Sequence, residues 1–140
     1  MKKLIILCTL ILSSLAFAND TISAPNAVVE VEINQDMGSD KGSVEQLYYN
    51  FGMIPVNMRT FVTYNVNNTG TYPLYAQNAY IQGGGHFGAR HNCRVLYPGQ
   101  RCQFTLEFMP FYEGFHVGDF VLTFDQAQIR VRMSGHAVRR

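Results

Sequence analysis

The sequence predicts an all-β protein built as a single antiparallel β-sandwich of about seven strands. Apolar and polar residues alternate along several short segments, and turns that contain Gly, Pro or Asn separate these segments. No window of ten or more residues keeps a 3.6-residue apolar period free of Gly or Pro, which argues against amphipathic helices. Because each predicted strand has one apolar face, a second sheet is needed to bury it.

Six segments carry the alternating pattern. In residues 103–108, for example, Phe104, Leu106 and Phe108 point to one side of the strand and the residues between them point to the other. The predicted strands cover residues 29–33, 59–66, 74–81, 103–108, 119–124 and 128–133. The connections are a polar loop at 34–43 and turns at 67–70, 82–85 and 97–100, the last with Pro98-Gly99 as in a type II turn.

The first eighteen residues are predicted to form a signal peptide. Lys2 and Lys3 precede an apolar stretch at 4–15, and Ala16-Phe17-Ala18 has the small-x-small pattern of a cleavage site. This stretch is too short to cross a bilayer, and no other stretch approaches about 18 apolar residues. We therefore expect an exported protein, periplasmic or extracellular, with no membrane span in the mature chain.

The length after cleavage fits one domain. Removing residues 1–18 from a chain of 140 leaves 122 residues, which is enough for one sandwich and too few for two domains. We expect an N-terminal strand and polar loop at 19–47, the sandwich core at 48–137 and a short tail at 138–140.

The charge balance excludes one class of partner. Cleavage would remove Lys2 and Lys3, two of the 11 basic residues, so nine would face 10 acidic residues, a net charge of −1. General nucleic-acid binders carry a basic surplus, so no nucleic acid is expected as a partner. Arg130 and Arg132 lie near the C-terminus with two further arginines. They form either a solvated strand face or a contact for an acidic partner or an anionic polymer.

Two cysteines remain after cleavage, Cys93 and Cys102. In an exported chain such a pair favours a disulfide over a catalytic thiol, two free thiols or a zinc site. Closing a loop of about ten residues should stabilise the fold by roughly 2.5–3 kcal/mol. A tight turn at Pro98-Gly99 would place Val95 opposite Cys102, so the bond requires a looser loop before Val95.

Several short motifs, taken in order, indicate a family. They are Phe51-Gly52, Asn68-Thr69-Gly70, Leu96-Tyr97-Pro98-Gly99, Phe108-Met109-Pro110 and Ser134-Gly135-His136. The region from about Tyr48 to Ala137 resembles the ASH/hydin type of immunoglobulin-like domain, as in exported choice-of-anchor D proteins. This type is related in fold to the major sperm protein and PapD-like domains. The resemblance implies an immunoglobulin-like sandwich that binds other proteins or builds assemblies, and it carries over no catalytic residue.

The residues themselves supply no catalytic motif, and no cofactor is expected. There is no activated nucleophile, no phosphate-binding Gly loop and no calcium loop. His86 and His91 leave open an alternative function, a small exported protein that binds a metal through histidine. The favoured function is a non-catalytic module that binds a protein partner or self-assembles.

The aromatic side chains are the candidate binding residues. Tyr72, Tyr75 and Tyr80 lie in one segment, and tyrosine is enriched at protein interfaces. Core packing is the competing interpretation. Tyr75 and Tyr80 are five residues apart on one predicted strand, so we expect one to be buried and the other exposed. Binding is expected through the exposed one or through an open strand edge.

Overall fold

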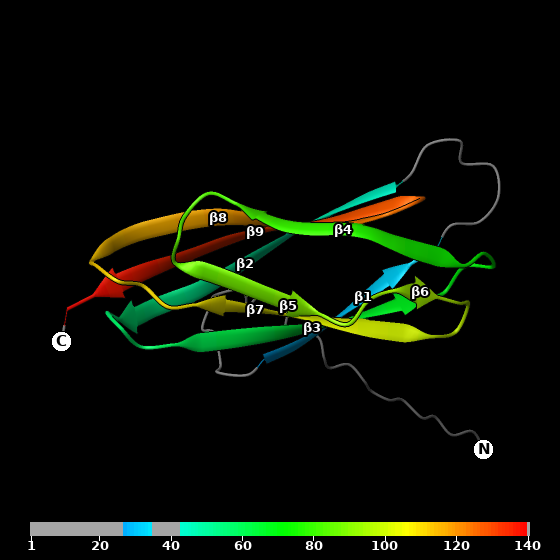
Figure 1. Cartoon of the computed structure of the whole chain (residues 1–140). Helices are drawn as coiled ribbons and strands as arrows, with labels where there is room; N and C mark the ends of the chain where they lie inside the picture. Colours follow the sequence, from blue (N-terminus) through cyan, green and yellow to red (C-terminus); the bar gives the residue numbers. More distant parts are fainter. Residues whose placement is uncertain (1–26, 35–42, 140) are drawn as a thin grey trace, which may run out of the picture.

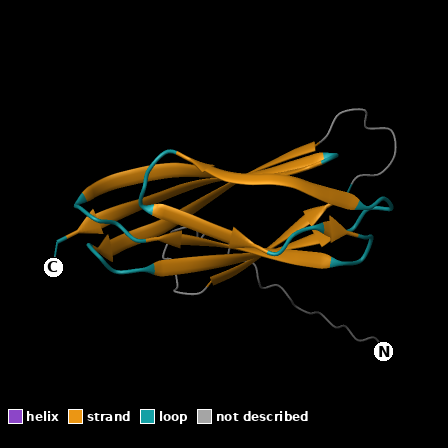
Figure 2. Cartoon of the chain, in the orientation of Figure 1, coloured by secondary structure: helices purple, strands orange, loops and turns teal. Residues whose placement is uncertain are grey.

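Nine β-strands in two packed sheets make up the described part of the chain. The computed structural model describes residues 27–34 and 43–139, and all its regular elements there are strands (Figures 1 and 2). The predicted signal peptide and most of the predicted polar loop lie outside the described residues. Nowhere in those two ranges is there a helix with the length and apolarity needed to cross a bilayer.

One sheet has four strands and the other has five. In the first sheet the order is β1 (Ala27–Ile33), β3 (Thr60–Asn68), β7 (Arg101–Phe108) and β5 (Phe87–His91). In the second it is β2 (Ser43–Pro55), β9 (Ala127–Val138), β8 (Gly114–Phe124), β4 (Leu74–Gln82) and β6 (Val95–Leu96). The predicted sandwich is confirmed, with nine strands where about seven were expected.

Two pairings are parallel, which the prediction of an antiparallel sandwich did not include. β1 runs parallel to β3, and β2 runs parallel to β9. Parallel neighbours need a connection that leaves the pair and returns. Between β1 and β3 the chain passes through β2 in the other sheet. β2 begins at Ser43, before the predicted start of the sandwich core at Tyr48.

The core lies between the sheets and is built from the inward faces of both. Along β9 every second side chain from Ala127 to Ala137 is buried, as the alternating sequence predicts. Phe51, Phe87 and Phe108 pack together, with the Phe108 ring 5.5 Å from Phe51 and 4.9 Å from Phe87 between centroids. Phe104, which the alternation placed on the same face of its strand as Phe108, is also fully buried.

Candidate binding surface

A β-bulge in β4 decides where the tyrosines point. The register with β8 shifts between Ala76 and Asn78, so one extra residue interrupts the alternation. Leu74 and Ala76 face inward before the shift, and Ala79 and Ile81 face inward after it. Tyr75 and Tyr80 are therefore both on the outer face, 45% and 38% exposed. The expectation that one of them is buried was wrong, because it assumed an unbroken strand.

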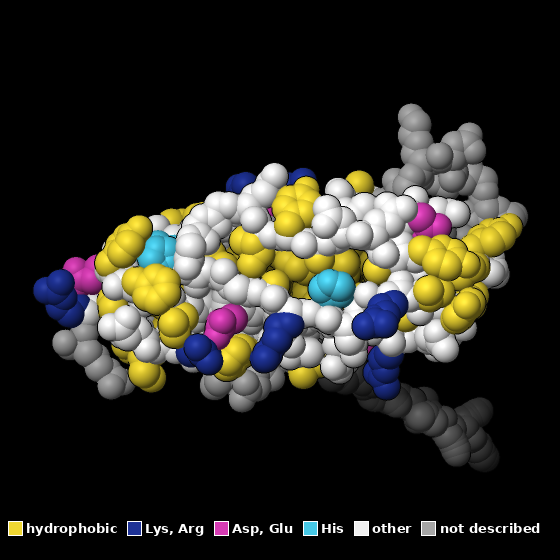
Figure 3. Space-filling model, in the orientation of Figure 1, with side chains coloured by type: hydrophobic (Ala, Val, Ile, Leu, Met, Phe, Trp, Pro, Cys, Tyr) yellow, Lys and Arg dark blue, Asp and Glu magenta, His cyan; other side chains and the backbone are white. Residues whose placement is uncertain are grey.

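Tyr75 belongs to a cluster that we call the tyrosine patch. Its members are Tyr72, Tyr75, Val95 and Tyr97, each between 39% and 52% exposed. Tyr75 and Val95 are cross-strand neighbours in the β4–β6 pair. Apolar side chains gather at the corresponding end of the molecule in the space-filling view, on the right where Figure 1 places β6 (Figure 3). Tyr80 lies further along β4, outside the patch.

Asn68 at the end of β3 holds the segments of the patch together. Its buried side-chain amide donates hydrogen bonds to the carbonyls of Tyr72 and Leu96, both at 2.8 Å. The backbone carbonyl of Asn68 accepts a hydrogen bond from the N–H of Gly99 at 2.8 Å. The turn before β4 and the turn after β6 are thus fixed by one residue. The tyrosine patch is consequently a preformed surface on a rigid support.

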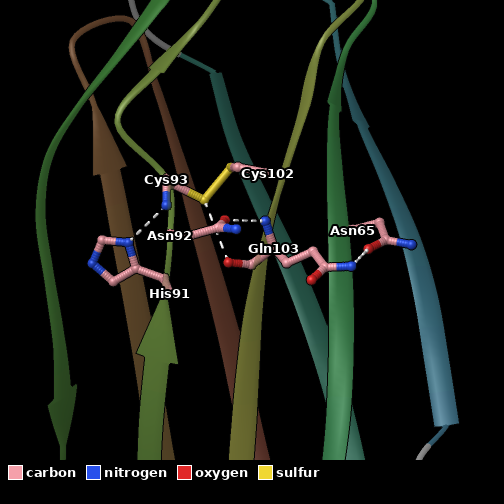
Figure 4. The surroundings of a disulfide bond; sticks show 6 residues. All are labelled: Asn65, His91, Asn92, Cys93, Cys102 and Gln103. Carbon is pink, nitrogen blue, oxygen red and sulfur yellow. Dashed lines mark hydrogen bonds between the residues drawn. A yellow bond between two sulfur atoms is a disulfide. The ribbon is translucent and has the colours of Figure 1, made fainter.

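The disulfide anchors the segment that carries β6. Cys93 and Cys102 are bonded, with their Cα atoms 5.0 Å apart (Figure 4), which confirms the predicted pair. The β5–β7 ladder continues to this point, because the N–H of Asn92 donates to the carbonyl of Gln103 at 3.1 Å. Asn92 Oδ1 accepts from the N–H of Gln103 at 2.8 Å.

The looser loop that the disulfide requires has a structural reason. After Cys93 the chain that follows β5 no longer pairs with β7. It crosses to the other sheet, where β6 pairs with β4. Val95 therefore does not compete with Cys93 for the position opposite Cys102. The bond closes the loop from which Val95 and Tyr97 project, so it supports one side of the tyrosine patch.

The structure does not bring His86 and His91 together. His86 precedes β5 and His91 ends it, and His91 Nδ1 accepts from the N–H of Cys93 at 3.1 Å. His86 instead packs on His116, with 4.0 Å between ring centroids. Within the described ranges no three side chains of His, Cys, Asp or Glu are grouped as metal ligands. The alternative site at His86 and His91 is therefore not supported by its geometry.

The His86–His116 pair was not foreseen from the sequence, since thirty positions separate the two residues and no local pattern links them. Both side chains are buried, and His86 Nδ1 accepts from the N–H of Phe111 at 3.1 Å. Burial lowers the pKa of His86, and the nearby His116 lowers it further. The exposed ring of Tyr112 lies over the pair, 4.7 Å from His86 between centroids. The pair therefore packs beneath the β7–β8 turn, with Tyr112 above it.

Comparison with known proteins places the fold in a family. The model of the HYDIN/CFA65/VesB-like Ig-like domain matches residues 43–136. The chain belongs to this family. The resemblance to ASH/hydin-type domains is thereby confirmed. Such immunoglobulin-like domains are generally non-catalytic, and membership indicates a binding or assembly module.

Solved structures show the same fold at low identity. The VesB protease of Vibrio cholerae matches with a TM-score of 0.52 and 11% identity, over 65% of this chain and 30% of VesB. The secreted serine protease VesC of the same organism matches with a TM-score of 0.49 and 11% identity, over 63% of this chain and 21% of VesC.

A match with the human protein CEP192 covers nearly the whole of the matched domain. Its PapD-like domain 7 gives a TM-score of 0.46 and 14% identity, over 92% of this chain and 98% of the domain. Comparison with curated proteins finds no match. The chain spans less than a third of the length of VesB and of VesC. At 11% identity, the likeness to VesB shows the fold alone.

Proposed function

We propose that the chain is a non-catalytic, exported module that binds a protein partner, or a further copy of itself, in the periplasm or outside the cell. The apolar leader at residues 1–18 and the cysteine pair support export. The observation that carries the binding proposal is the preformed tyrosine patch. Exposed tyrosines on a rigid support can bury large areas at little cost in conformational entropy.

An open strand edge adjoins the patch. β6 pairs with β4 only at Leu74 and Tyr75. From Asn78 to Gln82, β4 pairs with β8 on one side, and no described strand pairs with it on the other. A partner segment in extended conformation could add to this edge by backbone hydrogen bonds. The tyrosine patch would then bind side chains of the partner that lie next to the added segment.

The surroundings of the edge favour such a partner. β5 of the opposite sheet faces β4 across the front of the sandwich, and apolar side chains are visible in the band between them (Figures 1 and 3). Tyr75 itself is fixed, because its N–H donates to Asp125 Oδ1 at 3.0 Å and its carbonyl accepts from the Asp125 N–H at 2.9 Å. An incoming strand would therefore meet a backbone that these two hydrogen bonds already hold in place.

Site-specific photo-crosslinking tests the proposal. The photoreactive residue p-benzoylphenylalanine is placed at Tyr75 or Tyr97, and at Phe115 as the control. Phe115 is an exposed aromatic residue on β8, in a different part of the sheet. We expect one discrete adduct, with a partner or with a second copy, from the patch positions and not from Phe115. Adducts no stronger than those of the control would refute the patch as the binding surface.

A matched substitution measures the contribution of one side chain. Tyr75→Ala should leave the melting temperature nearly unchanged, since the ring is exposed, and should weaken the isolated complex by more than ~1 kcal/mol. Phe115→Ala is the control and should change neither the melting temperature nor the affinity of the complex. An unchanged affinity for Tyr75→Ala would show that the ring is no anchor.

A further inference from the structure

The outer face of the five-stranded sheet carries a second surface. It lies on β2, β9 and β8, whereas the tyrosine patch lies on β4, β6 and the turns beside them. We call it the arginine pocket, an open pocket of about 320 Å³. It is lined by Gln46, Tyr48, Asp119, Arg130 and Arg132. Strand pairing explains the set, since β2, β9 and β8 are neighbours and the lining side chains share their outer faces.

The residues of the arginine pocket form two adjacent rows across the sheet. Tyr48 is paired with Arg132 and Arg132 with Asp119. In the next row Gln46 is paired with Arg130, and Arg130 with Val121. The alternation in β9 predicted that both arginines point away from the core, and the structure places both on this outer face.

The two arginines have different partners. Arg132 is committed to Asp119, with Nε donating to Oδ1 at 3.0 Å and Nη2 donating to Oδ2 at 3.2 Å. This bond, together with the charge of Arg130, holds the pKa of Asp119 below its usual range. Arg130 Nη1 is 4.0 Å from Asp119 Oδ2, which is too far for a hydrogen bond. No hydrogen bond from Arg130 to another described residue is present.

The pocket therefore has one positive charge in excess. Two guanidinium groups face a single carboxylate, and the N–H donors of Arg130 lack an acceptor among the described residues. The Arg130 side chain is nevertheless only 32% exposed. Its cross-strand neighbour Val121 is fully buried although it points outward, between Arg130 on one side and Tyr80 on the other. The cation is thus held partly out of water on a packed support.

These observations select the chemistry of a ligand. A guanidinium with spare donors pairs best with a planar oxyanion, which it can bind with two hydrogen bonds. One carboxylate would neutralise the excess charge. A phosphate dianion would exceed the excess positive charge, and Asp119 would repel it about twice as strongly as a carboxylate. The near-neutral chain, with a formal net charge of +1, does not favour a nucleic acid.

We propose that the arginine pocket binds a glutamate or aspartate side chain of a partner protein. Arg130 pairs with the incoming carboxylate, Asp119 orients Arg132 beside it, and the exposed ring of Tyr48 contacts the adjoining peptide. This inference rests on the proposed function, because it assumes that the partner is a protein. It adds that the partner carries an acidic segment, and that binding spans the outer face of β2, β9 and β8.

Side-chain NMR of the arginines in the intact protein tests the pocket directly. The probe is a short capped peptide with one central glutamate, and the matched control peptide has glutamine in its place. We expect the Arg130 Nε–Hε signal to shift in a saturable way with the glutamate peptide only. Arg130→Gln should weaken binding about tenfold or more. Arg139→Gln should leave it unchanged, because Arg139 is well exposed and pairs with Glu113 instead.

Each remaining outcome counts against the inference. Equal binding of both peptides, unchanged binding by Arg130→Gln, or saturation by a single-stranded oligonucleotide or a polyuronate in place of the glutamate peptide would overturn it. Photo-crosslinking at Tyr75 keeps the two proposals separate. A lost peptide response with intact crosslinks overturns the arginine pocket alone, whereas a retained response without crosslinks overturns the tyrosine patch alone.

Discussion

Replacing Gly135 by alanine should destabilise the sandwich, because the inner face of β9 has no room for a methyl group there. A Cβ at this position would lie 2.4 Å from Cε2 and 2.7 Å from Cζ of Phe108. The Phe108 ring cannot retreat, since it is fully buried between Phe51 and Phe87. Overpacking of this kind costs about 1–3 kcal/mol, and the rigid ring places the expected value at the upper end.

Urea unfolding at fixed temperature measures this effect. The midpoint for Gly135→Ala should fall while the dependence on urea concentration stays the same, as a pure change in stability requires. Gly85→Ala is the matched control, because nothing lies within 4 Å of its added Cβ. Adding Phe108→Leu should remove part of the penalty, giving a coupling energy above ~0.5 kcal/mol. Wild-type stability for Gly135→Ala, or equal losses for both glycines, would refute the steric reasoning.

Three further predictions concern covalent and acid–base chemistry. Changing Cys93 and Cys102 to alanine should cost roughly 2.5–3 kcal/mol of unfolding free energy; labelling of either thiol by a maleimide before reduction would contradict the bond. Neutral His86 stabilises the fold fully above its ordinary pKa of 6.5, and this stability is lost as the pH falls from there through its lowered folded pKa. His86→Gln should therefore flatten the loss of stability as the pH falls below about 6.5, by at most ~1.4 kcal/mol per pH unit. The mature chain should begin at Asn19, and an intact mass that retains the leader would show otherwise.

The strands that follow simple alternation could be predicted from the sequence, and those that break it could not. In β7 and β9 each inward residue is apolar and most outward residues are polar, so the faces are evident. In β2 the outward Val44 and Tyr48 are as apolar as the inward Leu47 and Tyr49. The sequence pattern therefore does not predict which face of β2 is buried. A second irregularity, the register shift between Asn50 and Met53, interrupts β2 as well.

The candidate surfaces show the same limit. Tyr72 and Tyr75 were identified from their residue type, but Tyr97 was assigned only to a turn. Its place beside them depends on the two hydrogen bonds of Asn68, which no spacing rule reveals. Likewise, alternation predicts that Arg130 faces outward, whereas its neighbour Gln46 comes from a parallel pairing between distant segments. Local sequence patterns thus predict which face of a strand a residue lies on. Which residues of other strands lie beside it depends on long-range pairing.

The interior position of β9, between β2 and β8 in its sheet, has a consequence for synthesis and folding. β9 separates β2 from β8, so neither strand has this neighbour until the chain has been made as far as Val138. Folding must wait for that pairing, and contacts between such distant segments form slowly. A nascent chain therefore lacks the β2–β9 and β8–β9 pairs until β9 has been synthesised. Truncation before Ala127 would remove an interior strand of the sheet and leave β2 without the neighbour that joins it to β8.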